Sequence, residues 1–434
     1  MNQVQGATSA DGNIQEVRHI SYRRSLLASG AGNLLEWFDW TVYTVASVYI
    51  AAALFDKTDR MSSLLNTLAV FAAGFFARPL GGIVFGAMAD RIGRRAVLLT
   101  TMLLMAVASF LIALIPSYEV IGGWASAALL AARLIQGAAH GGETAASYAY
   151  IAEIAPPKRR GLWSSTVFLS VGAGSLIATF FMALLTQALS TDDMQHWGWR
   201  IPFAAGGLLA AFAMWMRRNM VESVELAAEP TPLAQTWSRA KMLREGLKLF
   251  MYEAGSTLTY YTWVSSAAIY AISVKHMDAH EAFTVSCYAQ VIYLVALPFI
   301  ARLSDLIGRK ITTLISLLGI AITIFPLWSL ISTAPWTLLV AQTIGLILVG
   351  FITGAKPASI SEQVPTRYRT KLFGFFISLA VAFFGGTASY ISTWLASIDK
   401  AWFFHVYLIV IALIASVIVS TWKNNTGKPM SEIT

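Results

Sequence analysis

The sequence contains few charged residues for its length. Asp, Glu, Lys and Arg together make up 12% of its 434 residues, whereas 56% are hydrophobic. A soluble domain carries about 25% charged residues, because its surface must be compatible with water. The composition therefore excludes an ordinary soluble enzyme or nucleic-acid-binding domain and indicates a membrane protein.

Cysteine and histidine are also scarce, and the motifs of catalysis are missing. Cys287 is the single cysteine, so no internal disulfide can form. The six histidines are scattered along the chain, and no nucleophile–base set or group of metal ligands is present. No P-loop occurs, so ATP is not expected to supply energy. We therefore expect no enzymatic activity, no metal and no cofactor.

Long apolar runs dominate the rest of the chain. A membrane-spanning helix needs about 20 mostly apolar residues. Twelve runs meet this requirement, at residues 26–53, 63–89, 96–116, 122–154, 162–189, 200–216, 247–274, 282–303, 312–332, 336–360, 372–397 and 401–422. The strands of a β-barrel would alternate over about 10 residues, whereas these runs are longer and apolar all round. We predict an all-α membrane protein with twelve transmembrane helices.

Lysine and arginine are distributed unevenly between the predicted loops. With a cytoplasmic N-terminus, 22 of the 31 fall in cytoplasmic segments, five fall outside, and four lie within spans or at their ends. Such a bias over short loops is the positive-inside pattern. It predicts a multi-pass protein of the bacterial inner membrane with both termini in the cytoplasm. It also explains the net charge of +8 without nucleic acid.

The longest loop divides the spans six and six. It carries two prolines and mixed charges, and its last part, residues 237–248, is amphipathic enough to lie on the inner membrane surface. The predicted organisation is a cytoplasmic tail (1–24), a six-helix bundle (25–216), a cytoplasmic linker (217–246), a second bundle (247–422) and a second cytoplasmic tail (423–434).

Two motifs occur once in each half. The string GAMADRIGRR at 86–95 recurs as ARLSDLIGRK at 301–310, and the spacing Glu-x-x-Pro-x-x-x-Arg at 153–160 recurs at 362–369. Both motifs recur at nearly the same offset, which is close to half the length of the chain. Two parallel repeats predict a pseudo-two-fold axis along the membrane normal, with a substrate site between the halves near mid-depth.

The first motif also suggests a latch. Its aspartate can face the first-turn amides of a neighbouring helix or the local arginines, and such a contact can break when the cytoplasmic side opens. The alternative is a basic loop that only fixes topology. We predict gating roles for Asp90, Arg91, Arg94, Arg95, Asp305 and Arg309. In the second copy Ala301 and Leu306 replace the glycine and the first basic residue, which predicts a weaker latch.

The string GxxxDRxGRR resembles the signature of the major facilitator superfamily. GNLLEWFDW at 32–40, RPLGG at 78–82, RLIQG at 133–137 with GGE at 141–143, and WGWRIPF at 197–203 resemble its metabolite:proton symporter family. That resemblance implies two pseudo-symmetric six-helix bundles and proton coupling. The family includes carriers of dicarboxylates, citrate, shikimate and proline or betaine, so it leaves the substrate open.

The chain departs from the family pattern at Lys356, which has no counterpart there, and at His140, where a small or apolar residue is usual. The residues after Trp422 are few. The osmosensing proline/betaine carriers have a long coiled-coil tail, which disfavours that substrate class.

Ionisable residues inside spans cost at least about 2.5–3.5 kcal/mol each on insertion scales, so they are functional candidates. Glu36 and Asp39 lie three residues apart on one helix face. In the fourth span Arg133, His140 and Ser147 recur every seven residues, so they form a polar stripe that Gln136, Glu143 and Tyr150 flank. Carboxylates and arginines in spans can also be structural pairs, and a histidine can be a structural core residue.

We predict proton coupling at Asp39, Glu143 and Glu36. We predict substrate binding at Arg78, Arg133, His140, Arg200, Tyr43, Tyr260 and Tyr261. With the resemblance, these residues indicate a monomeric symporter that imports protons with a small organic anion, a di- or tricarboxylate such as α-ketoglutarate. The alternatives are a proton-antiporting exporter of a drug or metabolite, a proline/betaine-type zwitterion symporter, and a membrane-embedded enzyme or receptor.

Overall fold

The computed structural model describes residues 30–433, apart from residues 31, 57, 93, 142 and 218–236. Helices in the first half cover residues 32–45, α2 (Ser47–Leu54), α3 (Arg60–Ile92), α4 (Arg94–Leu114), α5 (Tyr118–Ile121), α6 (Trp124–Ala139), α7 (Glu143–Ile154), α8 (Arg160–Ala188), α9 (Thr191–Asp193) and α10 (Arg200–Arg217). The second half contains α11 (Arg239–Tyr261), α12 (Ala267–Ser273), α13 (Ala279–Ile307), α14 (Arg309–Leu330), α15 (Pro335–Thr353), α16 (Lys356–Ser361), α17 (Thr366–Leu372), α18 (Ser378–Ala380), α19 (Ala388–Ser397) and α20 (Ala401–Ser420). Every regular element in these residues is helical, which confirms the predicted all-α fold.

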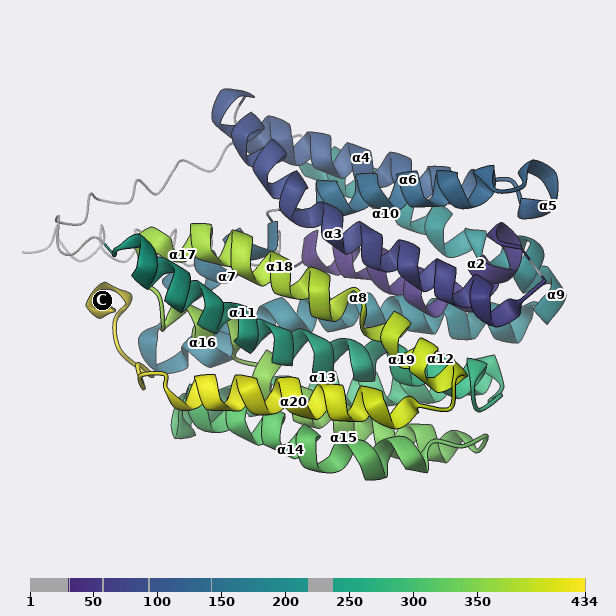
Figure 1. Ribbon diagram of the computed structural model, residues 1–434. Coiled ribbons are helices and arrows are strands. Elements are labelled where there is room, and N and C mark those ends of the chain that lie inside the picture. Colours follow the sequence, from purple (N-terminus) through teal and green to yellow (C-terminus); the bar gives the residue numbers. More distant parts are fainter. Residues whose placement is uncertain are drawn as a thin grey trace, which may run out of the picture.

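The long helices lie side by side in one elongated body (Figure 1). α3, α4, α6 and α10 run along one edge of the view, and α14, α15 and α20 run along the opposite edge. The two halves pack against each other through α8 with α13 and through α3 with α19. The start of α11 and the C-terminal residues lie at the same end of the body, as expected for two bundles that both begin and end on one side of a membrane.

Seven helices in the described part of the chain are long and apolar enough to cross a membrane. They are Arg60–Phe85, Pro157–Ala188, Ala279–Ile307, Arg309–Leu330, Pro335–Ser361, Thr366–Ser397 and Ala401–Ser420. The other five predicted spans also lie in helices, at residues 32–54, 94–114, 124–154, 200–217 and 239–273. Two of these five are interrupted: the helix that begins at residue 32 ends before a turn at Ala46, and α6 ends at Ala139, before the break that precedes α7.

Glycine allows α3 and α6 to approach closely. A Cβ atom on Gly137 would lie 1.9 Å from the carbonyl oxygen of Gly74, and one on Gly81 would lie 1.9 Å from that of Ala138. Any larger residue would push the helices apart, since a heavy atom cannot stand so near a backbone oxygen. This approach brings Arg78 of α3 beside the end of α6.

One local expectation is wrong. Residues 239–248 do not form a separate segment on the membrane surface, because they are the first turns of α11. Ser238 caps this helix: its hydroxyl accepts a hydrogen bond from the amide of Lys241 at 3.2 Å. The seventh long helix therefore begins at Arg239, about two turns before the predicted start of its span.

Candidate functional site

Asp39 and Arg133 form a buried ion pair between the first and fourth spans. Arg133 Nη1 lies 3.2 Å from Asp39 Oδ2, and both side chains are almost fully buried. Asp39 Oδ1 also accepts hydrogen bonds from Ser109 Oγ at 2.6 Å and from Gln136 Nε2 at 3.1 Å. The carboxylate is therefore well satisfied, which holds it in one orientation.

Arg133 is less well satisfied than its partner. Its Nη1 donates to Asp39 and, at 2.5 Å, to Gln136 Oε1, but Nε and Nη2 have no hydrogen-bond acceptor among the described residues. The guanidinium lies 4.0 Å from the ring centre of Tyr43 and 4.6 Å from that of Trp40. Cation–π contacts offset part of the desolvation cost. These two nitrogens therefore retain hydrogen-bonding capacity.

A second charge cluster lies beside the first. Glu36 Oε1 is 3.5 Å from Arg78 Nη2 and 3.4 Å from His140 Nδ1, and all three side chains are buried. The Arg78 guanidinium is 4.4 Å from the ring centres of both Trp40 and Phe75. Trp40 therefore contacts both arginines, and the two clusters form one site around its ring.

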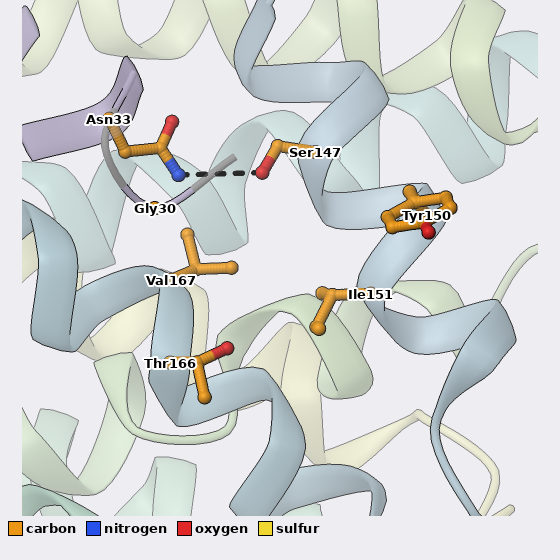
Figure 2. Close-up of a pocket in the computed structure, with 7 residues that line it drawn as sticks. All are labelled: Gly30, Asn33, Ser147, Tyr150, Ile151, Thr166 and Val167. Atoms are coloured by element: carbon orange, nitrogen blue, oxygen red, sulfur yellow. Dashed lines mark hydrogen bonds between the residues drawn. The ribbon is translucent and has the colours of Figure 1, made fainter. Parts of the chain in front are cut away.

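The first and fourth spans meet at three places. Asp39 contacts Arg133, Glu36 contacts His140, and Asn33 Nδ2 donates to Ser147 Oγ at 3.4 Å. The stripe expected on the fourth span thus faces the polar side of the first. Figure 2 shows the Asn33–Ser147 contact at a pocket between the first helix, α7 and α8. The pocket is lined by Gly30, Asn33, Ser147, Tyr150, Ile151, Thr166 and Val167.

Aromatic rings join this site to the second half. Trp37 packs edge-on against Tyr260, with ring centres 5.5 Å apart, and stacks on Tyr261 at 5.9 Å. Tyr261 also lies 5.6 Å from Phe75. Its hydroxyl has no hydrogen-bond partner in the part of the chain that the structure describes. The hydroxyl of Tyr43, by contrast, donates to the carbonyl of Thr67 at 2.8 Å.

Of the predicted proton-coupling and substrate-binding residues whose side chains the structure describes, Arg200 does not join the cluster. Arg200, at the start of α10, donates to the carbonyls of Ala113 at 3.1 Å and Ile115 at 2.6 Å, so it contacts the end of α4 and not the arginine cluster. Glu143 begins α7, but its side chain lies outside the described residues. Ser109, which binds Asp39, carries no signal in the sequence, because one serine in an apolar span resembles many others.

The contacts predicted as a latch join the two halves at the end of the body where the C-terminal residues lie. Asp305 accepts hydrogen bonds from the amides of Gly161 at 2.8 Å and Leu162 at 3.0 Å, in the first turn of α8. Arg309 Nη2 lies 2.7 Å from Asp305 Oδ1. This is the expected geometry of an aspartate that faces a helix N-terminus, and the helix belongs to the other half. The side chains of Asp90, Arg91, Arg94 and Arg95 lie outside the described residues.

The second repeated motif forms crossed ion pairs. Arg160 Nη1 lies 2.9 Å from Glu362 Oε1, and Arg369 Nη1 lies 3.0 Å from Glu153 Oε1. Each arginine therefore pairs with the glutamate of the other half. The repeat was visible in the sequence, but the partners were not, because a motif repeated within one chain does not say which copy binds which.

The C-terminal segment covers these pairs. The carbonyl of Lys428 accepts from Arg160 Nη2 at 2.9 Å, Asn425 Nδ2 donates to the carbonyl of Glu362 at 2.7 Å, and Arg369 Nη2 lies 3.0 Å from Met430 Sδ. Residues 423–433, predicted as a tail, thus bind both halves at the point where they meet.

Neutralising Asp305 should loosen this end of the molecule. Asp305→Asn removes the negative charge that binds two amides and Arg309, so we expect the cytoplasmic side to open at least about tenfold more often. The measurement uses Cys287→Ser protein with the buried reporter Ser164→Cys, labelled by an impermeant thiol reagent in inside-out vesicles. Asp192→Asn, at the opposite end, is the matched control. Equal labelling rates in all three proteins would contradict a latch at Asp305.

Comparison with known proteins agrees with this architecture. Residues 25–225 match the family model "Sugar (and other) transporter", and residues 254–432 match "Major Facilitator Superfamily". The alpha-ketoglutarate permease of Escherichia coli K12 is 33% identical over 411 residues, which is 94% of each chain. The citrate-proton symporter of Klebsiella pneumoniae is 34% identical over 375 residues, which is 85% of this chain and 84% of the relative.

A putative proline/betaine transporter of Staphylococcus aureus is also 33% identical, over 399 residues, 89% of this chain and 84% of the relative. Among solved structures, a D-xylose-proton symporter superimposes with a TM-score of 0.70 and 18% identity, covering 93% of this chain and 98% of the other. An inward-open xylose transporter from E. coli gives a TM-score of 0.67 at 19% identity, over 94% and 98% of the two chains. At these identities the structures support the fold and do not identify a substrate.

Proposed function

Since this chain belongs to the major facilitator superfamily and is a multi-pass membrane transporter, we propose that it imports a small organic anion together with protons. The substrate is a di- or tricarboxylate such as α-ketoglutarate, moved by alternating access of a monomer across the bacterial inner membrane. The excess of basic residues in the loops supports a cytoplasmic location for both termini.

This proposal rests on Arg133, whose buried guanidinium group is only partly hydrogen-bonded. A buried guanidinium with two nitrogens that lack acceptors among the described residues is costly unless a ligand binds there. Arg78 is buried nearby, over the same tryptophan ring. A carboxylate matches the planar donor pattern of arginine, so an organic acid fits this site better than a sugar does.

Charge balance explains the coupling to protons. Glu36 and Asp39 are balanced by Arg78 and Arg133 when all four are ionised and His140 is neutral. Each carboxylate of the substrate adds one negative charge to a site buried in low dielectric, and protonation of one site carboxylate for each uncompensated charge restores the balance. Asp39 is the favoured carrier, since a proton there releases Arg133 to the substrate. Glu143 and Glu36 are the other candidates.

Reorientation then depends on the cytoplasmic contacts. The Asp305 latch and the crossed pairs hold the halves together at that end, so all must break before substrate can leave to the cytoplasm. The free-energy cost of reorienting the loaded carrier is low only if the charges in its site are balanced. Substrate and protons are therefore transported together.

Thermal unfolding of the purified protein tests the substrate class. We expect di- or tricarboxylates to raise the Tm, because a ligand at 100 times its Kd stabilises the folded state by about 2.7 kcal/mol. Proline, betaine and xylose are the matched negative ligands. Stabilisation by proline or betaine and by none of the acids would replace this proposal with the zwitterion alternative. Efflux of the stabilising acid, driven by an inward proton gradient in vesicles, would support the exporter.

A further inference from the structure

The second half contains a buried ion pair that the proposed function does not use. Lys356 Nζ lies 2.6 Å from Glu253 Oε1, and the two residues are 4% and 1% exposed. Lys356 begins α16, directly after the break at Gly354 and Ala355 that separates α16 from α15. A buried lysine in a membrane span is expensive and marks a functional site by default.

The internal repeat gives this pair a counterpart. The number of residues between Asp39 and Glu253 is nearly the same as the number between Asp90 and Asp305, the two aspartates of the repeated motif. The fourth and tenth spans are each interrupted by a break. The helix resumes at Glu143 in the fourth span and at Lys356 in the tenth, and these two positions are separated by nearly the same number of residues. The Glu253–Lys356 pair therefore joins the seventh and tenth spans, as the carboxylate–cation contacts of the first half join the first and fourth.

The pair also lies at the contact between the halves. Lys356 Nζ is 5.4 Å from the ring centre of Phe168, on α8 of the first half. Phe168 lies 6.3 Å from Tyr260, which packs on Trp37, the neighbour of Glu36. Contacts between aromatic rings thus lead from Lys356 to the arginine site.

Both members of the pair have unused hydrogen-bonding capacity. An ammonium group has three donors, and within the described residues only Glu253 accepts from Lys356. Glu253 Oε2 has no hydrogen-bond partner in the same part of the chain. A pair whose only role is structural is expected to have its remaining atoms bonded, because unsatisfied buried groups are costly.

We propose that Lys356 is a second anchor for the substrate. It binds one carboxylate of a dicarboxylate, while the arginines of the first half bind the other and the rings of Trp37 and Tyr260 contact the carbons between them. This inference rests on the proposed function and narrows the substrate to acids with two carboxylates. A ligand held by one cation in each half also draws the halves together when it binds.

The test compares a five-carbon diacid with its half-amide, which has the same length and one carboxylate fewer. In wild-type protein we expect the diacid to bind at least about tenfold more tightly. In E253Q/K356Q, which removes both charges and leaves no buried ion unpaired, we expect nearly equal affinities, with half-amide binding unchanged. His405→Gln is the matched control, since His405 is a buried polar residue of α20 outside the site, and it should keep the wild-type preference.

Full diacid preference in E253Q/K356Q would overturn the proposal and leave the proposed function intact. Failure of the wild-type protein to bind either acid would overturn this proposal, and if in addition no di- or tricarboxylate raises the Tm, the proposed function is overturned as well. If the double variant does not fold, the charge-swapped E253K/K356E replaces it: the ion pair remains, but the cation moves to α11, and the diacid preference should fall by about tenfold. Wild-type preference in that variant overturns the proposal as well.

Discussion

Arg133→Gln is expected to lower carboxylate uptake by at least about 100-fold. The arginine is buried, bonds Asp39 through one nitrogen and directs its other donors to no protein acceptor among the described residues. Losing one partner of a buried charge pair costs about 3–5 kcal/mol, and a substrate anion loses its counter-charge as well. Uptake of radiolabelled acid into proteoliposomes, at matched amounts of folded protein, measures the effect.

Two further variants separate binding from folding. Arg133→Lys keeps the charge but not the planar donor pattern, so we expect partial uptake and weaker binding. The double variant Asp39→Asn/Arg133→Gln removes both charges, so it should fold without an isolated buried acid and still fail to bind substrate. If the double variant binds the acid as wild type does, Arg133 only neutralises Asp39 and the substrate is held elsewhere.

The local features of the site were predictable from the sequence, because helix geometry is regular. A spacing of three places Glu36 and Asp39 on one face, and a spacing of seven places Arg133 and His140 on another. The contact between these faces was not predictable, since the register of two helices depends on packing. That packing includes the close approach at Gly137, which no local pattern in the sequence pairs with Gly74.

The repeat contained more information than its motifs alone suggested. Lys356 was a departure from the family pattern without an assigned role, yet the offset between the repeated motifs relates the spans of Glu253 and Lys356 to the first and fourth spans. The structure shows the two residues in contact at 2.6 Å. The partners of Arg160 and Arg369 needed the structure, because the repeat fits pairing within each half as well as across them. Arg200 also needed it, since the surrounding string does not show that its guanidinium bonds the end of α4.

Asp39→Asn should abolish accumulation while leaving exchange intact. The neutral amide imitates a protonated aspartate, so the loaded carrier, in which the substrate carboxylate neutralises Arg133, can still reorient. The empty carrier would have to reorient with Arg133 buried and without its counter-charge, which costs several kcal/mol. We therefore expect counterflow within about threefold of wild type and loss of pH-driven accumulation, with both measured side by side in the same proteoliposomes.

Glu36→Gln is the matched control, because it removes a carboxylate one helical turn away and leaves the Asp39–Arg133 pair in place. If Asp39 carries the proton, Glu36→Gln should retain accumulation, although it weakens the contact with Arg78. Full accumulation by Asp39→Asn would rule Asp39 out. Glu143→Gln would then be tested next, since Glu143 begins the helix that follows His140. Loss of exchange in Asp39→Asn would instead mean that the aspartate is needed to hold Arg133 in its binding orientation. That result would make Asp39 part of the substrate site, and the proton would have to bind elsewhere.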